Sequence, residues 1–318
     1  MKYWSKLTSS VYAQLMERLE SEVGLPSAGT VVQVKVKNDS YAQHRISFQG
    51  TRVSFYMGKG DPVMKERMKR RQELCSTLVV NSCNMLDRVS ASTIELLDAA
   101  GSFYNQKVIL VGSHAFGVIG NMLGVTWQGD MVETEDIDLG RFIKLAGTGA
   151  IDLSDTLERA GFRKIPELNP KNPSTSFKHD NSGMKIDFLT PLRGKPTGKP
   201  AKLTGMDVFA ERLRFFDYLI TNPVQGAAIT KNGVLVQVPQ PARYAFHKCI
   251  VATRRDASKE AKRKKDIQQA ESLFEVLLEF RVTDLEQAWE ALEWKAHAKK
   301  GIKMLSLEIQ KELEDIIL

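Results

Sequence analysis

The sequence predicts an α+β protein in which helices flank a mixed sheet, and three patterns support this prediction. Short apolar runs alternate with helical segments between residues 107 and 190. Before them, the alternating stretch VVQVKVKND and the two runs that follow it predict antiparallel strands. Residues 259–318 carry helical patterns. We therefore expect an N-terminal segment at 1–100, a core with the sheet at 101–205, and a mainly helical C-terminal lobe at 206–318.

The composition predicts an ordered protein of two or three subdomains. Of the 318 residues, 42% are hydrophobic and 26% are charged, which is typical of globular chains. The sequence has no apolar run of transmembrane length, and its start lacks the long apolar core of a signal peptide. Cys75, Cys83 and Cys249 form no CxxC motif, which disfavours a disulfide framework and a zinc site. We expect a cytoplasmic protein with reduced thiols and no membrane partner.

The N-terminal segment is expected to begin with an amphipathic helix and a small β-meander. Val11, Leu15, Leu19 and Val23 are four residues apart, so residues 1–24 predict a helix with one apolar face. Asn-Asp-Ser and Gln-Gly-Thr turns separate the three strands of the meander.

The aromatic residues of this meander allow two interpretations. Nucleic-acid bases could stack on Tyr41, Phe48, Phe55 and Tyr56, as they do on sheets that bind single strands. Core packing explains the same residues at least as well. A helical linker follows the meander, with an apolar set made of Leu74, Leu78, Met85 and Leu96.

The stretch that begins at Val108 is the most informative of the chain. It reads VILVGSHAFGVIGNMLGV, which predicts an apolar strand, a turn at Gly112 and Ser113, and a helix. Glycine allows close backbone approach to a ligand, and the first N–H groups of a helix are open to a phosphate. We therefore expect Gly112 and Ser113 to bind phosphate. His114 is a candidate ligand or base, although a lone histidine beside a helix start is more often a packed or capping residue.

Three aspartates follow on predicted strands. Asp136 and Asp138 point to one face of a strand because side chains alternate, while Ile137 and Leu139 point to the core. Asp187 lies between apolar residues on a later strand and is expected to reach the same site. Carboxylate oxygens are the ligands that Mg²⁺ and Mn²⁺ prefer. The pattern predicts a divalent-metal site beside the phosphate site.

This order of elements resembles the DNA polymerase β-type nucleotidyltransferase superfamily, over roughly residues 107–190. Within the superfamily the chain is most similar to a bacterial group of nucleotidyltransferase-like proteins. The motifs that carry this similarity are Gly112-Ser113-His114-Ala115, Leu123-Gly124-Val125 and Thr134-Glu135-Asp136-Ile137-Asp138. The chain departs from the superfamily in one respect, because 22 residues separate Ser113 from Asp136 and a shorter spacing is more usual.

The resemblance implies a metal-dependent enzyme that transfers a nucleoside monophosphate from a nucleoside triphosphate to a hydroxyl. Asp136 and Asp138 would hold two Mg²⁺ or Mn²⁺ ions at the triphosphate. Asp187 would help to hold the ion that lowers the pKa of the acceptor hydroxyl and would accept the proton of that hydroxyl. Ser113 and the N–H groups after Gly112 would bind the β or γ phosphate. Pyrophosphate would be the leaving group.

The C-terminal lobe is expected to face the catalytic sheet. FAERLRFFDYLI predicts a helix over 209–220, and GAAITKNGVLVQV predicts a β-hairpin around its Asn-Gly turn. A further helix begins at Pro241. In nucleotidyltransferases that the chain resembles, this lobe supplies Lys or Arg to the triphosphate. The candidates here are Lys248, Lys265 and Arg254.

The net charge of +7 favours a polyanionic partner. Basic residues cluster at 65–72, 193–202 and 254–265, although such clusters are also ordinary solvated charge. We expect a tRNA-like RNA as acceptor, ATP among the nucleotides, and a toxin or defence effector with an antitoxin as one role that would fit. Transfer to a protein or a small molecule is the first alternative. A non-catalytic nucleic-acid-binding protein is the second, and the three aspartates argue against it.

Overall fold

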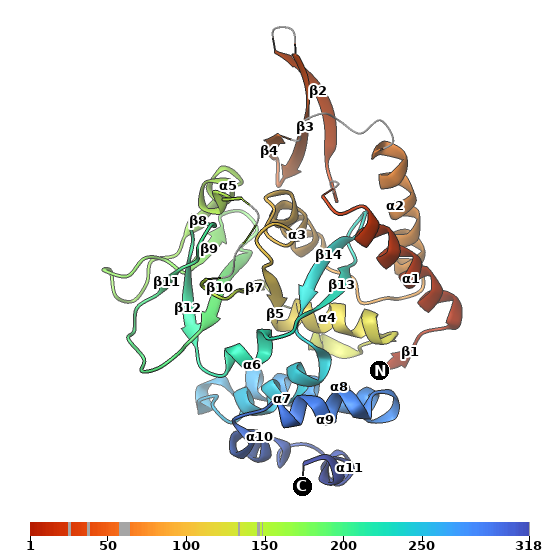
Figure 1. Ribbon diagram of the computed structural model, residues 1–318, viewed down its shortest axis with the longest axis vertical. Coiled ribbons are helices and arrows are strands. Elements are labelled where there is room, and N and C mark those ends of the chain that lie inside the picture. The colour runs from red at the N-terminus through yellow and green to blue at the C-terminus, as the bar shows by residue number, and fades with distance from the viewer. Residues whose placement is uncertain are drawn as a thin grey trace.

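A mixed sheet occupies the centre of the computed structural model (Figure 1). The structure describes residues 1–24, 27–36, 39–56, 64–132, 134–144, 147 and 149–317. The strands of the sheet are Ile109–Val111 (β5), Asp136–Gly140 (β7), Phe162–Lys164 (β8), Ser176–His179 (β9), Lys185–Pro191 (β10), Ala201–Lys202 (β11), Phe209–Leu213 (β12), Val224–Ala228 (β13) and Val234–Val238 (β14). Their order is β11-β12-β10-β7-β5-β14-β13, with β9 and β8 branching from β10. The predicted α+β class, with a mixed sheet and flanking helices, is confirmed.

The middle of this sheet contains both parallel and antiparallel pairs. β10 runs parallel to β7 and to β12, whereas β5 runs antiparallel to β7 and parallel to β14. In the register of β7 and β10, Asp138 lies opposite Asp187, and Asp136 lies opposite Lys185. Because side chains alternate along each strand, these four side chains lie on one face of the sheet and form a single cluster across the two strands.

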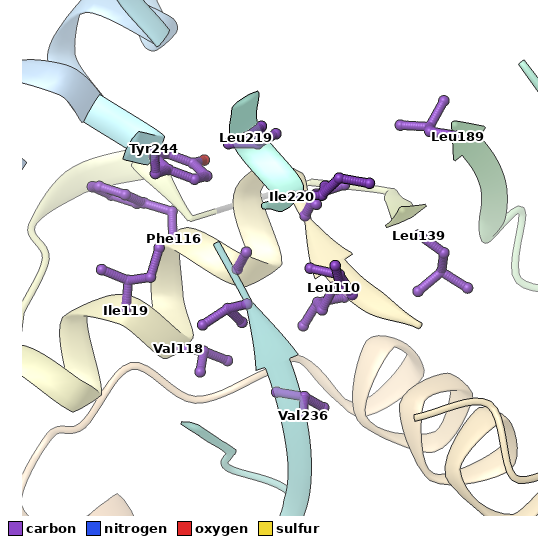
Figure 2. Close-up of a cluster of buried hydrophobic side chains, with 14 of the residues drawn as sticks. Leu110, Phe116, Val118, Ile119, Leu139, Leu189, Leu219, Ile220, Val236 and Tyr244 are labelled. Carbon is purple, nitrogen blue, oxygen red and sulfur yellow. The ribbon is translucent and has the colours of Figure 1, made fainter. Parts of the chain in front are cut away.

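The core lies between this sheet and its helices. Three helices between residues 88 and 159 accompany the sheet, namely Arg88–Ala99 (α3), Gly112–Leu123 (α4) and Leu153–Arg159 (α5). Figure 2 shows the apolar cluster in which Phe116 of α4 joins Leu110 and Val236 of the strands. The ring of Tyr244 stacks on Phe116 with 6.1 Å between centroids. The same core therefore joins the sheet to the C-terminal helices.

The N-terminal segment contains the predicted helix and meander. Its elements are Lys2–Tyr3 (β1), Lys6–Ser21 (α1), Thr30–Val36 (β2), Asp39–Phe48 (β3), Thr51–Tyr56 (β4) and Met64–Val80 (α2), and β1 pairs with Val125–Thr126 (β6). Val11, Leu15 and Leu19 are buried on α1, while Val23 lies beyond its end. In Figure 1 the separate sheet β2-β3-β4 lies at the opposite end of the molecule from the C-terminal helices.

Core packing accounts for part of the aromatic set of the meander. Phe48 is fully buried and stacks on Phe162, with 5.3 Å between centroids. Tyr56 is 74% exposed, and its ring lies 5.3 Å from that of Tyr41. Phe55 is half-buried beside a histidine of β3. Base stacking stays a prediction for the two tyrosines, and Phe48 is a core residue.

One arginine of the first basic cluster is a core residue instead of part of a charged surface. Arg71 is 2% exposed and donates to the carbonyl oxygens of Asn232 (2.9 Å) and Gly233 (2.7 Å). Its neighbour Arg70 is exposed and pairs with Glu66 along α2. Arg71 therefore fastens α2 to the turn between β13 and β14.

The C-terminal lobe is helical, as predicted. Its helices are Phe216–Ile220 (α6), Pro241–Ala252 (α7), Glu260–Phe280 (α8), Val282–Glu290 (α9), Lys295–Ile302 (α10) and Leu307–Ile317 (α11). The predicted hairpin forms as β13 and β14, but it extends the central sheet instead of standing in the lobe. None of the helices in the described part of the chain is both long and apolar enough to cross a bilayer.

The helix predicted over 209–220 is wrong in its first half. Residues 209–213 form strand β12, which pairs with β10 on one side and β11 on the other, and only residues 216–220 are helical. Tertiary pairing overrides the local helical pattern here. The division of the chain at residues 100 and 205 stays a prediction.

Candidate active site

Two neighbouring strands bring three carboxylates together. Asp136 and Asp138 lie on β7 and Asp187 lies on the adjacent β10. One oxygen from each carboxylate lies within 4.8 Å of the other two. This spacing is suited to a shared divalent cation.

The strand sequence explains why these side chains face the same way. On β7, Ile137 and Leu139 are buried, and the aspartates between them emerge on the opposite face. Ile186 and Phe188 are buried on either side of Asp187 in the same manner. Alternation of side chains along a strand thus fixes the cluster.

The carboxyl of Asp138 has a raised pKa. Burial is the largest cause, and the neighbouring carboxylates of Asp136 and Asp187 add to it, so that the pKa rises to about 7. The ammonium groups of Lys248 and Lys185 lower it in part. Near neutral pH this carboxyl is therefore only partly ionised, and a bound cation would displace the proton that remains.

Hydrogen bonds and an ion pair hold the other two aspartates, Asp136 and Asp187. The Thr134 hydroxyl donates to Asp136, and the Ser176 hydroxyl on β9 donates to Asp187. The Lys185 ammonium lies 2.7 Å from one oxygen of Asp187 and 2.8 Å from the other. Sequence reasoning missed Lys185, although its position two residues before Asp187 on a strand was a usable signal.

Gly112 connects β5 to α4 at the edge of the carboxylate cluster. Its φ of +66° is in the left-handed region, and a Cβ at this position would overlap the Asp138 carboxylate. Among the described residues, no side-chain hydrogen bond caps the N-terminus of α4, so its first N–H groups are open to an anion. The Tyr244 hydroxyl donates to the carbonyl oxygen of Gly112 at 2.9 Å, which ties the turn to α7.

Ser113 and His114 line a neighbouring cavity of about 730 Å³, together with Thr134. His114 is 4% exposed, and burial lowers its pKa to about 4. Its ring is therefore neutral and packed at pH 7, with Nδ1 lacking a hydrogen-bond partner among the described residues. The structure thus divides the predicted motif, since Gly112 lines the cavity of the aspartates and Ser113 lines the adjacent one.

The three aspartates open into a cavity of about 840 Å³ between the sheet and the C-terminal lobe. From the lobe, Lys248 and Arg254 line this cavity. The Lys248 ammonium pairs with Asp266 at 2.7 Å, and the Arg254 guanidinium lies 5.3 Å from the ring centroid of Phe215. The structure thus brings two of the three predicted cations to the cavity.

Lys265, the third predicted cation, is outside the lining of this cavity. Burial is the first cause that lowers its pKa and the nearby Lys248 the second, whereas Asp136 raises it. Its positive charge therefore interacts electrostatically with Lys248 and Asp136 from outside the cavity lining.

The cavity has an acidic side that sequence reasoning also missed. Glu167 and Glu211 line it near Asp187. Burial raises the pKa of Glu211, with the Asp187 charge as the second cause. No signal pointed to Glu211, because the segment around it was expected to be a helix.

Comparison with known proteins agrees with this geometry. A family model described as a nucleotidyltransferase matches residues 88–294, which is more than half of the chain. No curated protein and no solved structure matches. The matched span begins with α3 and includes all strands of the central sheet and the three aspartates. The chain therefore belongs to this family of nucleotidyltransferases.

Proposed function

We propose that the protein transfers a nucleoside monophosphate from a nucleoside triphosphate to a hydroxyl acceptor, at the carboxylate triad of Asp136, Asp138 and Asp187. One observation carries the proposal. In a nucleotidyltransferase chain, three carboxylates lie within 4.8 Å of one another beside the uncapped N-terminus of α4. Such a site offers cation ligands and phosphate ligands side by side.

The carboxylates fit divalent ions, because crowding and burial raise the pKa of Asp138 and a doubly charged ion offsets both effects. Two Mg²⁺ or Mn²⁺ ions bound there would polarise the transferring phosphate and stabilise the ionised acceptor hydroxyl. Asp136 and Asp138 would serve the triphosphate. Asp187, on the neighbouring strand, would orient the acceptor hydroxyl and accept its proton.

The phosphate groups would lie against the start of α4. The open N–H groups after Gly112, that of Ser113 among them, would bind the β or γ phosphate. Lys248 and Arg254 would neutralise charge on the leaving pyrophosphate from the opposite wall. Lys265 would contribute only at longer range.

RNA is the acceptor that we propose first. Arg214, Arg254, Arg255, Lys259 and Lys262 line the same cavity, and a row of cations suits a polyanion. A tRNA-like RNA, with ATP as a donor, would fit a toxin or defence effector controlled by an antitoxin. Toxicity on expression that Asp136→Ala abolishes would support that role. The three free, buried cysteines support a cytoplasmic location.

A small-molecule acceptor is the second candidate, and a specific observation favours it. Glu167 and Glu211 line the cavity on the side of Asp187, where the acceptor would bind. Carboxylates repel a phosphate backbone and attract amines. A hydroxylated, cationic small molecule would fit this side better than RNA.

Transfer of labelled nucleotide distinguishes these acceptors. Purified protein is incubated with each α-³²P-labelled nucleoside triphosphate, Mg²⁺ or Mn²⁺, and separate RNA, protein and small-molecule fractions. The Asp136→Ala/Asp138→Ala variant is the control. We expect label in RNA with the native chain alone. Label in the small-molecule or protein fraction would show that the acceptor is a small molecule or a protein instead of RNA. Label that persists in the double variant would show that the aspartates are not the catalytic site.

A further inference from the structure

We propose that Lys185 is a built-in counter-cation of the triad, which competes with a divalent ion for Asp187 and passes to a nucleotide phosphate when that ion enters. The proposal rests on the metal-dependent function given above. It assigns to one lysine the coupling between metal binding and nucleotide binding.

The contacts of Asp187 are the first support. The Lys185 ammonium lies within 2.8 Å of both of its carboxylate oxygens, and the Ser176 hydroxyl donates to one of them. A lone pair of Asp187 is still open to an ion, because an ionised carboxylate has about four lone-pair sites. An ion bound there would, however, lie close to the ammonium of Lys185 and be repelled by its charge.

The position of Lys185 in the sheet is the second support. It lies two residues from Asp187 on the same face of β10, and opposite Asp136 in the register with β7. Three carboxylates thus share the nearby ammonium, and a cation placed among them would be repelled by it. The side chain of Lys185 is 40% exposed and lines the cavity, so it has room to move into that cavity.

Lys248 provides an internal comparison. Its ammonium also lines the cavity, but it pairs with Asp266, which is outside the triad and also binds Arg255. Its side chain is only 14% exposed. Lys248 is therefore held in place by its own partner, whereas the carboxylate that pairs with Lys185 is the one that a metal ion would need.

A consequence is that metal and nucleotide favour each other's binding. Without nucleotide, release of the ammonium from Asp187 costs it a charge-assisted hydrogen bond. With nucleotide, a phosphate oxygen offers a new charge-assisted hydrogen bond. By linkage, the metal then strengthens nucleotide binding by the same factor by which the nucleotide strengthens metal binding.

Lys185→Met tests this proposal through two affinities of opposite expected change. Binding of Mn²⁺ to metal-free protein is followed by the electron paramagnetic resonance of free Mn²⁺. Binding of a non-hydrolysable ATP analogue is then followed by calorimetry at saturating Mn²⁺. We expect Lys185→Met to bind Mn²⁺ about tenfold tighter without nucleotide, and the analogue several-fold more weakly with Mn²⁺.

Two controls make the test specific. Lys185→Arg keeps the charge and should stay close to the native affinity for Mn²⁺. Lys202→Met removes a lysine that pairs with Asp207 at 2.7 Å on the surface, and it should change neither affinity. Unchanged Mn²⁺ affinity in Lys185→Met, or a parallel fall of both affinities, would overturn the proposal.

Failure of the underlying function has a different signature. Asp138→Asn is titrated with Mn²⁺ beside the native protein. If both bind Mn²⁺ equally, or neither Lys185→Met nor the native protein binds it, the triad is not a metal site and the counter-cation has no role. If the native protein binds Mn²⁺ through Asp138 and Lys185→Met matches it, only the proposal about Lys185 fails.

Discussion

Gly112 is the position where the backbone and the carboxylate cluster constrain each other most tightly. Its φ is positive, and an added Cβ would overlap Asp138. We expect Gly112→Ala to abolish nucleotidyl transfer and to lower the melting temperature. Gly129→Ala is a matched control, because its φ of +71° is similar and, its chain neighbours apart, no atom of the described residues lies within 4 Å of the added Cβ. Equal transfer rates in the two variants would show that the turn at Gly112 has no part in the reaction.

The raised pKa of Asp138 makes stability depend on pH. Its pKa is about 7 in the folded protein and 3.8 as the ordinary value, so the folded state binds the proton more tightly. The free energy of unfolding of metal-free protein should therefore fall as pH rises from about 4 to about 7, because of this group. Affinity for a divalent ion should rise over the same interval, since the ion displaces the proton.

Asp138→Asn isolates this contribution. The variant cannot ionise, so it should be more stable than the native protein above pH 7 by a few kcal/mol and should lose that advantage near pH 4. Thermal unfolding in the presence of a chelator measures the difference across the pH range. Asp155→Asn, on the surface, is the control. An advantage that does not change with pH would contradict the assignment.

Sequence reasoning at this scale identified the three aspartates because strand alternation is local information. Lys185 and Ser176 needed more than alternation. Ser176 reaches Asp187 only through the pairing of β9 with β10, and that register is not written in either segment alone. Ser113 was expected beside the ions but lines the adjacent cavity, because the direction of a side chain at a helix start depends on how the helix packs.

At the scale of elements, a buried arginine adds hydrogen bonds to the apolar contacts that attach α2 to the sheet. Arg71 donates to two carbonyl oxygens of the β13–β14 turn and lies 3.9 Å from Glu22. We expect Arg71→Met to cost about 2–4 kcal/mol of stability, because it leaves two buried carbonyl acceptors without this donor and removes one of the two arginines that pair with the buried Glu22 carboxylate. The adjacent Arg70→Met removes an exposed pair and should cost less than about 1 kcal/mol. Urea denaturation compares them, and equal costs would contradict the anchoring role.

Elements with a strong local pattern were predicted well. The helix after Gly112, the Asn-Gly hairpin and the helix from Pro241 all carry their own start or turn residues. Strand β12 was missed because Phe209–Leu213 has the spacing of an amphipathic helix, and its conformation is decided by β10 and β11 on either side. The hairpin was expected in the lobe for a similar reason, since its pairing with β5 is a long-range contact.

At the scale of the whole molecule, the sheet and the lobe enclose one cavity with a basic side and an acidic side. If RNA is the acceptor, Lys259→Glu/Lys262→Glu should weaken RNA binding. The slope of log affinity against log salt concentration should also fall, by the equivalent of about one to two phosphate contacts. Lys300→Glu/Lys303→Glu makes the same charge change on α10, away from the cavity lining. Filter binding at several salt concentrations compares the two. Equal losses would mean that only net charge matters.

The architecture can be predicted from the sequence where the apolar residues of a helix or strand recur with the period of that element. The α+β class and the helical lobe were predicted from such patterns. The size and composition of the cavity could not be predicted, because it is lined by strands and helices as far apart in the sequence as Val111 and Lys262.

The central claim is that the triad catalyses transfer of the nucleoside monophosphate and not of the terminal phosphate. One measurement tests it most directly: the protein is incubated with RNA or the other acceptor fractions and with ATP labelled at either the α or the γ phosphate. Native protein should transfer the α label to the acceptor and release the γ label as pyrophosphate. The Asp138→Asn variant should do neither. Transfer of the γ label to the acceptor, or α transfer that survives in Asp138→Asn, would contradict the account.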